Sequence, residues 1–213
     1  MKVGRATIIL FWAVGVMAGC ALNAATPSAP TAQREESGST YRAVFDHWTR
    51  EGRIYDGLDV KLISAATYLS DAFRLAFATE YALRYRMTDL EKEKLIQDQK
   101  DAAAAYEDFI FAAYVPEKAW DDFDKKNSIW KIFITTDRGN QIKPIEIRKL
   151  DKRDAKTAYF YAYVTPWKSI YRLRFPKLTA ADYSGTAGAG FDSFKLVVTS
   201  VLGSAEMAWR SKP

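Results

Sequence analysis

Apolar and polar residues change their spacing along this chain, from a mainly helical period in the first half to a period of two in the second. Up to about residue 107, apolar side chains recur mostly every three or four positions, which is typical of helices that bury one face. From Ser128 onward they alternate with polar side chains, which is typical of strands with one buried face. The pattern therefore predicts a domain in which helices come early and strands dominate later.

Two helices are predicted between residues 71 and 107. Ser70 is a favourable N-cap for the first, which we expect over residues 71–87. The second, expected over residues 89–107, opens with a capping box in which Thr88 is followed three residues later by Glu91. A broad apolar face indicates that the first helix packs well into the body: it includes Phe73, Phe77 and Tyr81. An earlier helical stripe consists of Tyr41, Val44, Phe45 and Trp48.

Seven or eight strands are predicted outside these helices. The candidate segments are residues 58–67, 109–116, 128–135, 142–150, 157–164, 169–175, 194–198 and 205–209. Segment 109–116 also fits helical spacing, and we assign it as a strand because the preceding helix is already long. Pro144 has no backbone N–H group to donate, so its strand is expected at a sheet edge or with a bulge.

Short alternating strands joined by turn residues indicate an antiparallel β-sandwich. We therefore expect an α+β fold that is mainly β, with two inserted helices. The immunoglobulin-like arrangement is one candidate by analogy alone, because the Cys…Trp…Cys spacing of that fold is absent from the sequence.

The first twenty residues have a layout of their own. Lys2 and Arg5 give a short positive region, and an apolar run follows from Ala6 to Met17. Positive charge, apolar run and small residues are the layout of a secretory signal peptide. The run is too short for a transmembrane helix, which needs roughly 20 apolar residues.

The residues Met17-Ala18-Gly19-Cys20 resemble the lipobox of bacterial lipoproteins. The resemblance implies that residues 1–19 are a signal peptide, and that Cys20 receives a diacylglyceryl group and becomes the acylated first residue. It also implies a place on the periplasmic face of the outer membrane, because Ala21 stands where an inner-membrane retention signal would have Asp. The partners that follow are the membrane, through the lipid anchor, and an envelope protein.

The segment after Cys20 is rich in small, polar and proline residues without apolar periodicity. Such a segment cannot bury enough surface to order its backbone. We therefore predict a lipidated cysteine and disordered tether over residues 20–40, followed by a single globular domain over residues 41–213.

Composition and net charge limit the class of protein and the kinds of partner that the sequence allows. With 48% hydrophobic residues the chain is expected to be globular and not disordered. The formal net charge is +5, and removal of Lys2 and Arg5 with the signal peptide would leave +3. This mild excess argues against nucleic-acid binding, which needs clustered basic residues. Weak attraction to an anionic membrane surface fits better.

No motif for catalysis, metal or cofactor binding stands out. His47 is the only histidine and Cys20 the only cysteine, so a His-rich or thiolate zinc site is excluded. The acidic residues around Asp121 and Asp124 depart from the EF-hand calcium pattern. The glycine-rich segment 185–190 precedes a predicted strand and lacks the ending of a phosphate loop. We expect no catalytic residue, no metal and no cofactor.

An aromatic row is the candidate for partner binding. Tyr159, Tyr161 and Tyr163 would share one face of the predicted strand 157–164, with Trp167 just after it. Exposed, such a row suits a partner protein, peptide or glycan, whereas buried it would be core. The predicted function is a lipid-anchored envelope protein that binds or assembles at the membrane surface. The alternatives are a carboxylate-dependent envelope hydrolase and a purely structural lipoprotein.

Overall fold

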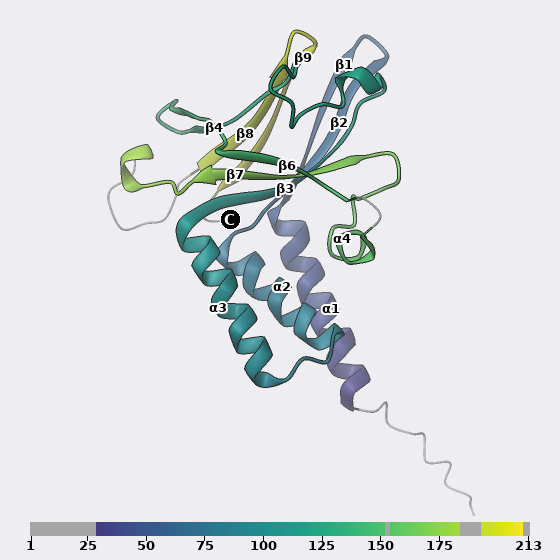
Figure 1. Cartoon of the computed structure of the whole chain (residues 1–213), viewed down its shortest axis with the longest axis vertical. Coiled ribbons are helices and arrows are strands. Elements are labelled where there is room, and N and C mark those ends of the chain that lie inside the picture. Colours follow the sequence, from purple (N-terminus) through teal and green to yellow (C-terminus); the bar gives the residue numbers. More distant parts are fainter. Residues whose placement is uncertain (1–28, 152–153, 184–192, 211–213) are drawn as a thin grey trace, which may run out of the picture.

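The computed structural model describes residues 29–151, 154–183 and 193–210. Two antiparallel sheets and four α-helices make up the fold, and strands dominate it (Figure 1). The expected α+β, mainly β sandwich is therefore confirmed. The immunoglobulin-like arrangement stays an analogy.

Sheet A has five strands in the order β1-β2-β3-β7-β6. Their bounds are β1 Thr49–Asp56, β2 Asp59–Tyr68, β3 Tyr106–Tyr114, β7 Ser169–Pro176 and β6 Glu146–Leu150. Sheet B has four strands in the order β5-β4-β8-β9. Their bounds are β5 Gln141–Ile142, β4 Lys131–Thr136, β8 Ser193–Ser200 and β9 Gly203–Arg210.

The helices gather at one end of the molecule, and the β1–β2 and β8–β9 hairpins point away from them (Figure 1). The helix bounds are α1 Ala29–Trp48, α2 Asp71–Arg84, α3 Asp89–Ala105 and α4 Ala155–Phe160. As expected, α2 and α3 are an insertion, because they connect β2 and β3, which pair directly in sheet A. Both predicted caps are confirmed: the Ser70 side chain accepts from the Phe73 backbone N–H, and Thr88 and Glu91 form the capping box.

The central strands of sheet A are buried on both faces. One face packs against sheet B through a large apolar cluster that includes Phe109, Leu173 and Trp209. The other face is covered by helical residues such as Phe45 and Phe73. This double cover explains why seven consecutive residues of β3, from Glu107 to Ala113, are buried. Helix α3 lies further out, packs against α2 and buries only Ala103.

The tether prediction is wrong for residues 29–40, because α1 begins at Ala29. Contacts distant in sequence hold this helix. α1 packs along α2, and the Ser37 hydroxyl donates to the fully buried carboxylate of Glu80 at 2.7 Å. A local pattern of small and polar residues does not reveal such contacts. Cys20 and the rest of segment 20–28 lie outside the described residues.

The predicted strand 142–150 is divided at Pro144. β5 ends at Ile142 and is an edge of sheet B, whereas β6 begins at Glu146 and is an edge of sheet A. The expectation that Pro144 marks a sheet edge is confirmed, and the chain changes sheets at this point.

Strand β1 is not among the predicted strands, and it contains Gly52 and ends just before Gly57. Gly57 has a φ of +61° and does form a turn. Gly52 is a buried strand residue, where an added Cβ would lie 3.1 Å from the Ala205 Cβ and from the Ser64 hydroxyl. Here glycine permits close packing of β1 against β9.

Candidate functional site

The aromatic residues predicted as a binding row do not share a strand. The prediction of a strand over residues 157–164 is wrong, since α4 ends at Phe160 and a turn follows. The cause is a local N-cap: the Asp154 side chain accepts from the backbone N–H groups of Lys156 and Thr157. Tyr159 therefore lies on a helix, while Tyr161 and Tyr163 lie beyond its end.

Two of the three tyrosines belong to the interior under the helices. Tyr161 is 8% exposed and packs against Phe45 and Phe73. The half-buried Tyr163 stacks on Phe45, and its hydroxyl donates to the Ile110 carbonyl at 2.8 Å. Burial raises the pKa of both phenols. They are therefore parts of the core and not of one open binding face.

The other two members of the predicted row reach the surface separately. Tyr159 is 48% exposed and donates its hydroxyl to Glu80 at 2.7 Å. Trp167, at 80% exposed, lies in the loop before β7. The structure thus leaves Trp167 as an isolated exposed ring, and isolated apolar side chains are common on protein surfaces.

A buried network of charges links the helices to sheet A. The carboxylate of Asp108 on β3, only 2% exposed, accepts from Arg74 on α2 at 2.8 Å. It also accepts from Arg174, its direct neighbour on β7, at 2.8 and 3.0 Å. Burial alone would raise the pKa of Asp108, but the hydrogen bonds from Arg174 and Arg74 outweigh it and hold the pKa below its ordinary value.

Arg74 extends the same network to α3. Its remaining donors reach the Leu69 carbonyl at 2.9 Å and the Gln99 side chain at 3.0 Å. One guanidinium therefore contacts groups on α3, on β3 and in the segment before α2. Because Arg74 is only 5% exposed, this network fixes where α3 lies relative to α2 and the sheet.

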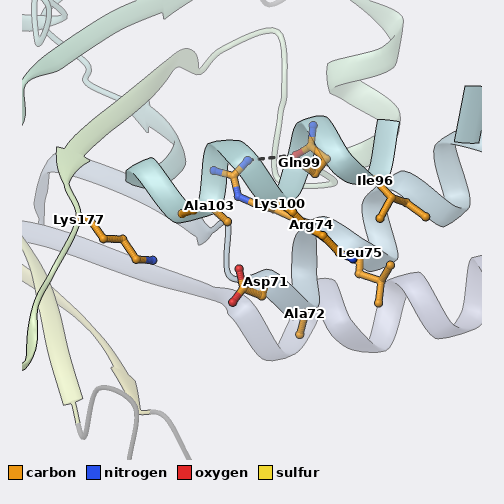
Figure 2. Close-up of a pocket in the computed structure, with 10 residues that line it drawn as sticks. Asp71, Ala72, Arg74, Leu75, Ile96, Gln99, Lys100, Ala103 and Lys177 are labelled. Carbon is orange, nitrogen blue, oxygen red and sulfur yellow. Dashed lines mark hydrogen bonds between the residues drawn. The ribbon is translucent and has the colours of Figure 1, made fainter. Parts of the chain in front are cut away.

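A cavity of about 560 Å³ lies between α2 and α3, beside this network (Figure 2). Arg74 forms part of its wall, and Figure 2 shows the Arg74–Gln99 hydrogen bond there. Lys177 reaches toward it from the end of β7. The apolar part of the lining comes from both helices: Ala72, Leu75, Ile96, Ala103 and Ala104. Its volume lies in the range of small-molecule sites, roughly 300–1,000 Å³.

Some charged side chains around the cavity form ion pairs within the protein, and others do not. Lys177 is paired with Glu107, with 2.9 Å between the ammonium and a carboxylate oxygen, and Arg74 is paired with Asp108. Asp71 and Lys100 also line the cavity, and neither forms an ion pair or side-chain hydrogen bond with another described residue. Two exposed charges of opposite sign therefore remain at this site.

The carboxylates behind the cavity are already engaged. Glu107 accepts from the Tyr68 hydroxyl at 2.6 Å as well as from Lys177. Asp108 is held between two arginines. Both carboxylates are therefore already hydrogen-bonded or ion-paired within the protein.

The remaining candidates from the sequence were the histidine, the acidic residues near Asp121 and the glycine-rich segment. His47 is exposed on α1, edge-on to Trp48. Asp121 accepts from the hydroxyls of Ser169 and Tyr171. Within the described ranges, no three His, Cys, Asp or Glu side chains are grouped to hold a metal ion. Glycine segment 185–190 falls outside those ranges.

No described helix is both long enough and apolar enough to cross a membrane. Comparison with known proteins finds no matching family model, no matching curated protein and no matching solved structure.

The cavity and its charged wall were not predicted from the sequence. A signal was present, because Arg74 stands between Phe73 and Leu75, and Asp108 precedes the apolar run of β3. Charged residues inside apolar segments are almost never fully buried unless they are paired. Their pairing across residues 74, 108 and 174 depends on the tertiary fold, so local spacing could not reveal it.

Proposed function

We propose that this protein is a lipid-anchored protein of the cell envelope that binds a ligand at the membrane surface, with the cavity between α2 and α3 as the ligand site. The observation that carries the proposal is the lining of that cavity, which combines apolar side chains from two helices with a few charged groups. Binding sites for small molecules have this composition.

The proposed location rests on the lipobox-like residues that end at Cys20. A diacylglyceryl thioether would give Cys20 two acyl chains, which suffice for stable anchoring where one chain does not. Ala21 favours the periplasmic face of the outer membrane. A protein partner in the envelope fits this location, whereas nucleic acid does not.

Binding is favoured over carboxylate-dependent hydrolysis because of how the nearby acids are held. The lowered pKa of Asp108 keeps it ionised at neutral pH, so it would be a poor general acid. Its oxygens already accept from Arg74 and Arg174. A purely structural role is the other alternative, and it predicts that filling the cavity changes no binding.

The site is tested by filling the cavity in a matched pair of variants. Ala104→Trp places an indole in the lining, whereas Ala105→Trp adds the same ring at the next exposed position, outside the lining. Fluorescence titration with the neutral apolar probe N-phenyl-1-naphthylamine should show binding to the parent and to Ala105→Trp. It should show at least tenfold weaker binding to Ala104→Trp. Equal binding by all three chains, each checked for an unchanged melting temperature, would reject the site.

The anchor is tested separately with Cys20→Ser, which removes the only thiol. The parent should partition into the detergent phase and carry acyl groups on Cys20 by mass spectrometry. The variant should stay uncut by the lipoprotein peptidase or be released without lipid. An unmodified Cys20 in the mature parent would reject the anchor and leave the cavity test unaffected.

A further inference from the structure

The cavity between α2 and α3 presents one unmatched negative and one unmatched positive charge. Asp71 lies in the first turn of α2, and Lys100 lies on α3. Both are exposed, both line the cavity, and neither pairs with the other or with another residue in the described part of the chain. The other two charges of the lining are matched within the protein, as Arg74 with Asp108 and Lys177 with Glu107.

We propose that this cavity binds a single-chain amphiphile with a zwitterionic head. The anionic group of the head lies against Lys100 and its cationic group against Asp71. The hydrocarbon chain lies against the apolar lining, chiefly Leu75 and Ile96. This inference rests on the proposed function, because it names the ligand class of the same cavity.

The apolar lining supports a hydrocarbon chain. Leu75 is 51% exposed and Ile96 is half-buried, although both lie on the facing sides of two packed helices. The alanines at positions 72, 103 and 104 leave room between the helices. A chain placed there would cover apolar surface, and each methylene that becomes buried should raise the affinity about fourfold.

The two unmatched charges select the head. A purely anionic head would be attracted by Lys100 but repelled by Asp71. A purely cationic head would be attracted by Asp71 but repelled by Lys100. A zwitterionic head satisfies both charges. One ion pair at an exposed site corresponds to about fivefold in affinity at most, so preferences of a few-fold are expected.

The test is displacement of N-phenyl-1-naphthylamine by amphiphiles that share a dodecyl chain and differ in the head. The heads are phosphocholine (zwitterionic), phosphate (anionic), trimethylammonium (cationic) and maltoside (neutral), each below its critical micelle concentration. The mature chain, residues 20–213, is used with Cys20→Ser, so that neither acyl groups nor the apolar signal segment requires detergent that would compete with the ligands. Dodecylphosphocholine should displace the probe at about threefold to fivefold lower concentration than the other three.

Two charge-neutralising variants separate the roles of the charges. Asp71→Asn should remove the preference for phosphocholine over phosphate, and Lys100→Gln should remove the preference for phosphocholine over trimethylammonium. Lys94→Gln and Asp98→Asn change exposed charges of α3 outside the lining, so they should leave both preferences unchanged. Octyl, decyl and dodecyl phosphocholine should differ by about 15-fold per two methylenes until the cavity is filled.

The outcomes distinguish this inference from the proposed function. If the probe binds and all four heads displace it equally, the zwitterionic head is rejected and the cavity remains a binding site. If phosphate alone or trimethylammonium alone is preferred, the head inference is equally wrong. If the probe fails to bind, or binds Ala104→Trp as well as the parent, the proposed site itself is rejected.

Discussion

The two faces of sheet A are formed by alternate residues of the same strands, yet they are packed in different ways. On β3, Phe109 and Phe111 face sheet B and join an apolar cluster of aromatic and aliphatic side chains. Asp108, the residue before them, points instead into a charged network with α2. The face toward sheet B is thus held mainly by apolar burial. The face toward the helices is held by apolar burial and, in addition, by directional polar contacts.

The two faces therefore have different roles: the face toward sheet B mainly stabilises the fold, and the face toward the helices mainly positions α2 and α3. Burial of aromatic rings is the larger favourable contribution to folding, because it scales with apolar area. A buried ion pair loses much of its gain to desolvation, so it adds little net stability but is costly to break. The Asp108 network is therefore best understood as fixing where α2 and α3 lie, and the cavity between them depends on that position.

The largest expected effect is on the sheet B side. Trp209 is fully buried, and its ring packs against Phe109 and Phe194 with centroids 5.4 and 5.5 Å away. Trp209→Ala should lower the free energy of unfolding by about 3–5 kcal/mol in urea denaturation. Trp167→Ala, at an 80% exposed position, is the control and should change it by less than about 0.5 kcal/mol. Similar losses in the two variants would mean that the inter-sheet cluster is not the main core.

The second effect breaks the helix-side network. Asp108→Ala leaves Arg74 and Arg174 buried or half-buried without their carboxylate, and should cost about 3 kcal/mol. Binding of N-phenyl-1-naphthylamine should weaken as well, because Arg74 lines the cavity. Glu206→Gln removes an exposed pair with Lys195 and should alter neither quantity. Undiminished probe binding in folded Asp108→Ala would show that the network does not shape the cavity.

The third effect is a pH dependence of the free energy of unfolding, which arises from Asp108 on the helix-facing side of sheet A. The pKa of Asp108 is lower in the folded protein than its usual value near 3.9. Its ionised form therefore contributes stability above about pH 4, and the contribution is lost as the pH falls through the folded-state pKa. The stability difference between the parent and Asp108→Asn should be constant from about pH 8 to pH 5 and shrink below pH 4. A difference that grows in acid would contradict the sign of this pKa shift.

The smallest effect concerns α3, which buries only Ala103. The Thr88 hydroxyl accepts from the Glu91 backbone N–H at the start of this helix. Thr88→Ala should lower stability by about 1 kcal/mol or less. Hydrogen exchange should quicken in α3 while β3 keeps its protection. Uniform acceleration across α3 and the sheets would mean that α3 opens only with the whole fold.

The sequence by itself determined the features that depend on neighbouring residues. The caps at Ser70 and Thr88 are hydrogen bonds within one turn, so their residues suffice to predict α2 and α3. Alternation predicted β4, β7, β8 and β9, because successive strand residues face opposite sides. Pro144 predicted a sheet edge from its missing donor alone.

Only the tertiary structure decided the features that depend on distant residues. Helix α1 is held by contacts with α2, including the hydrogen bond from Ser37 to Glu80, which its own composition does not show. Tyr161 and Tyr163 become core because α4 and its turn pack onto sheet A, although alternation alone suggested one strand. The cavity arises where α2, α3 and the end of β7 meet, and the burial of Asp108 requires arginines from positions 74 and 174. Packing and charge pairing act through space, so they override a local pattern wherever distant segments supply the partner.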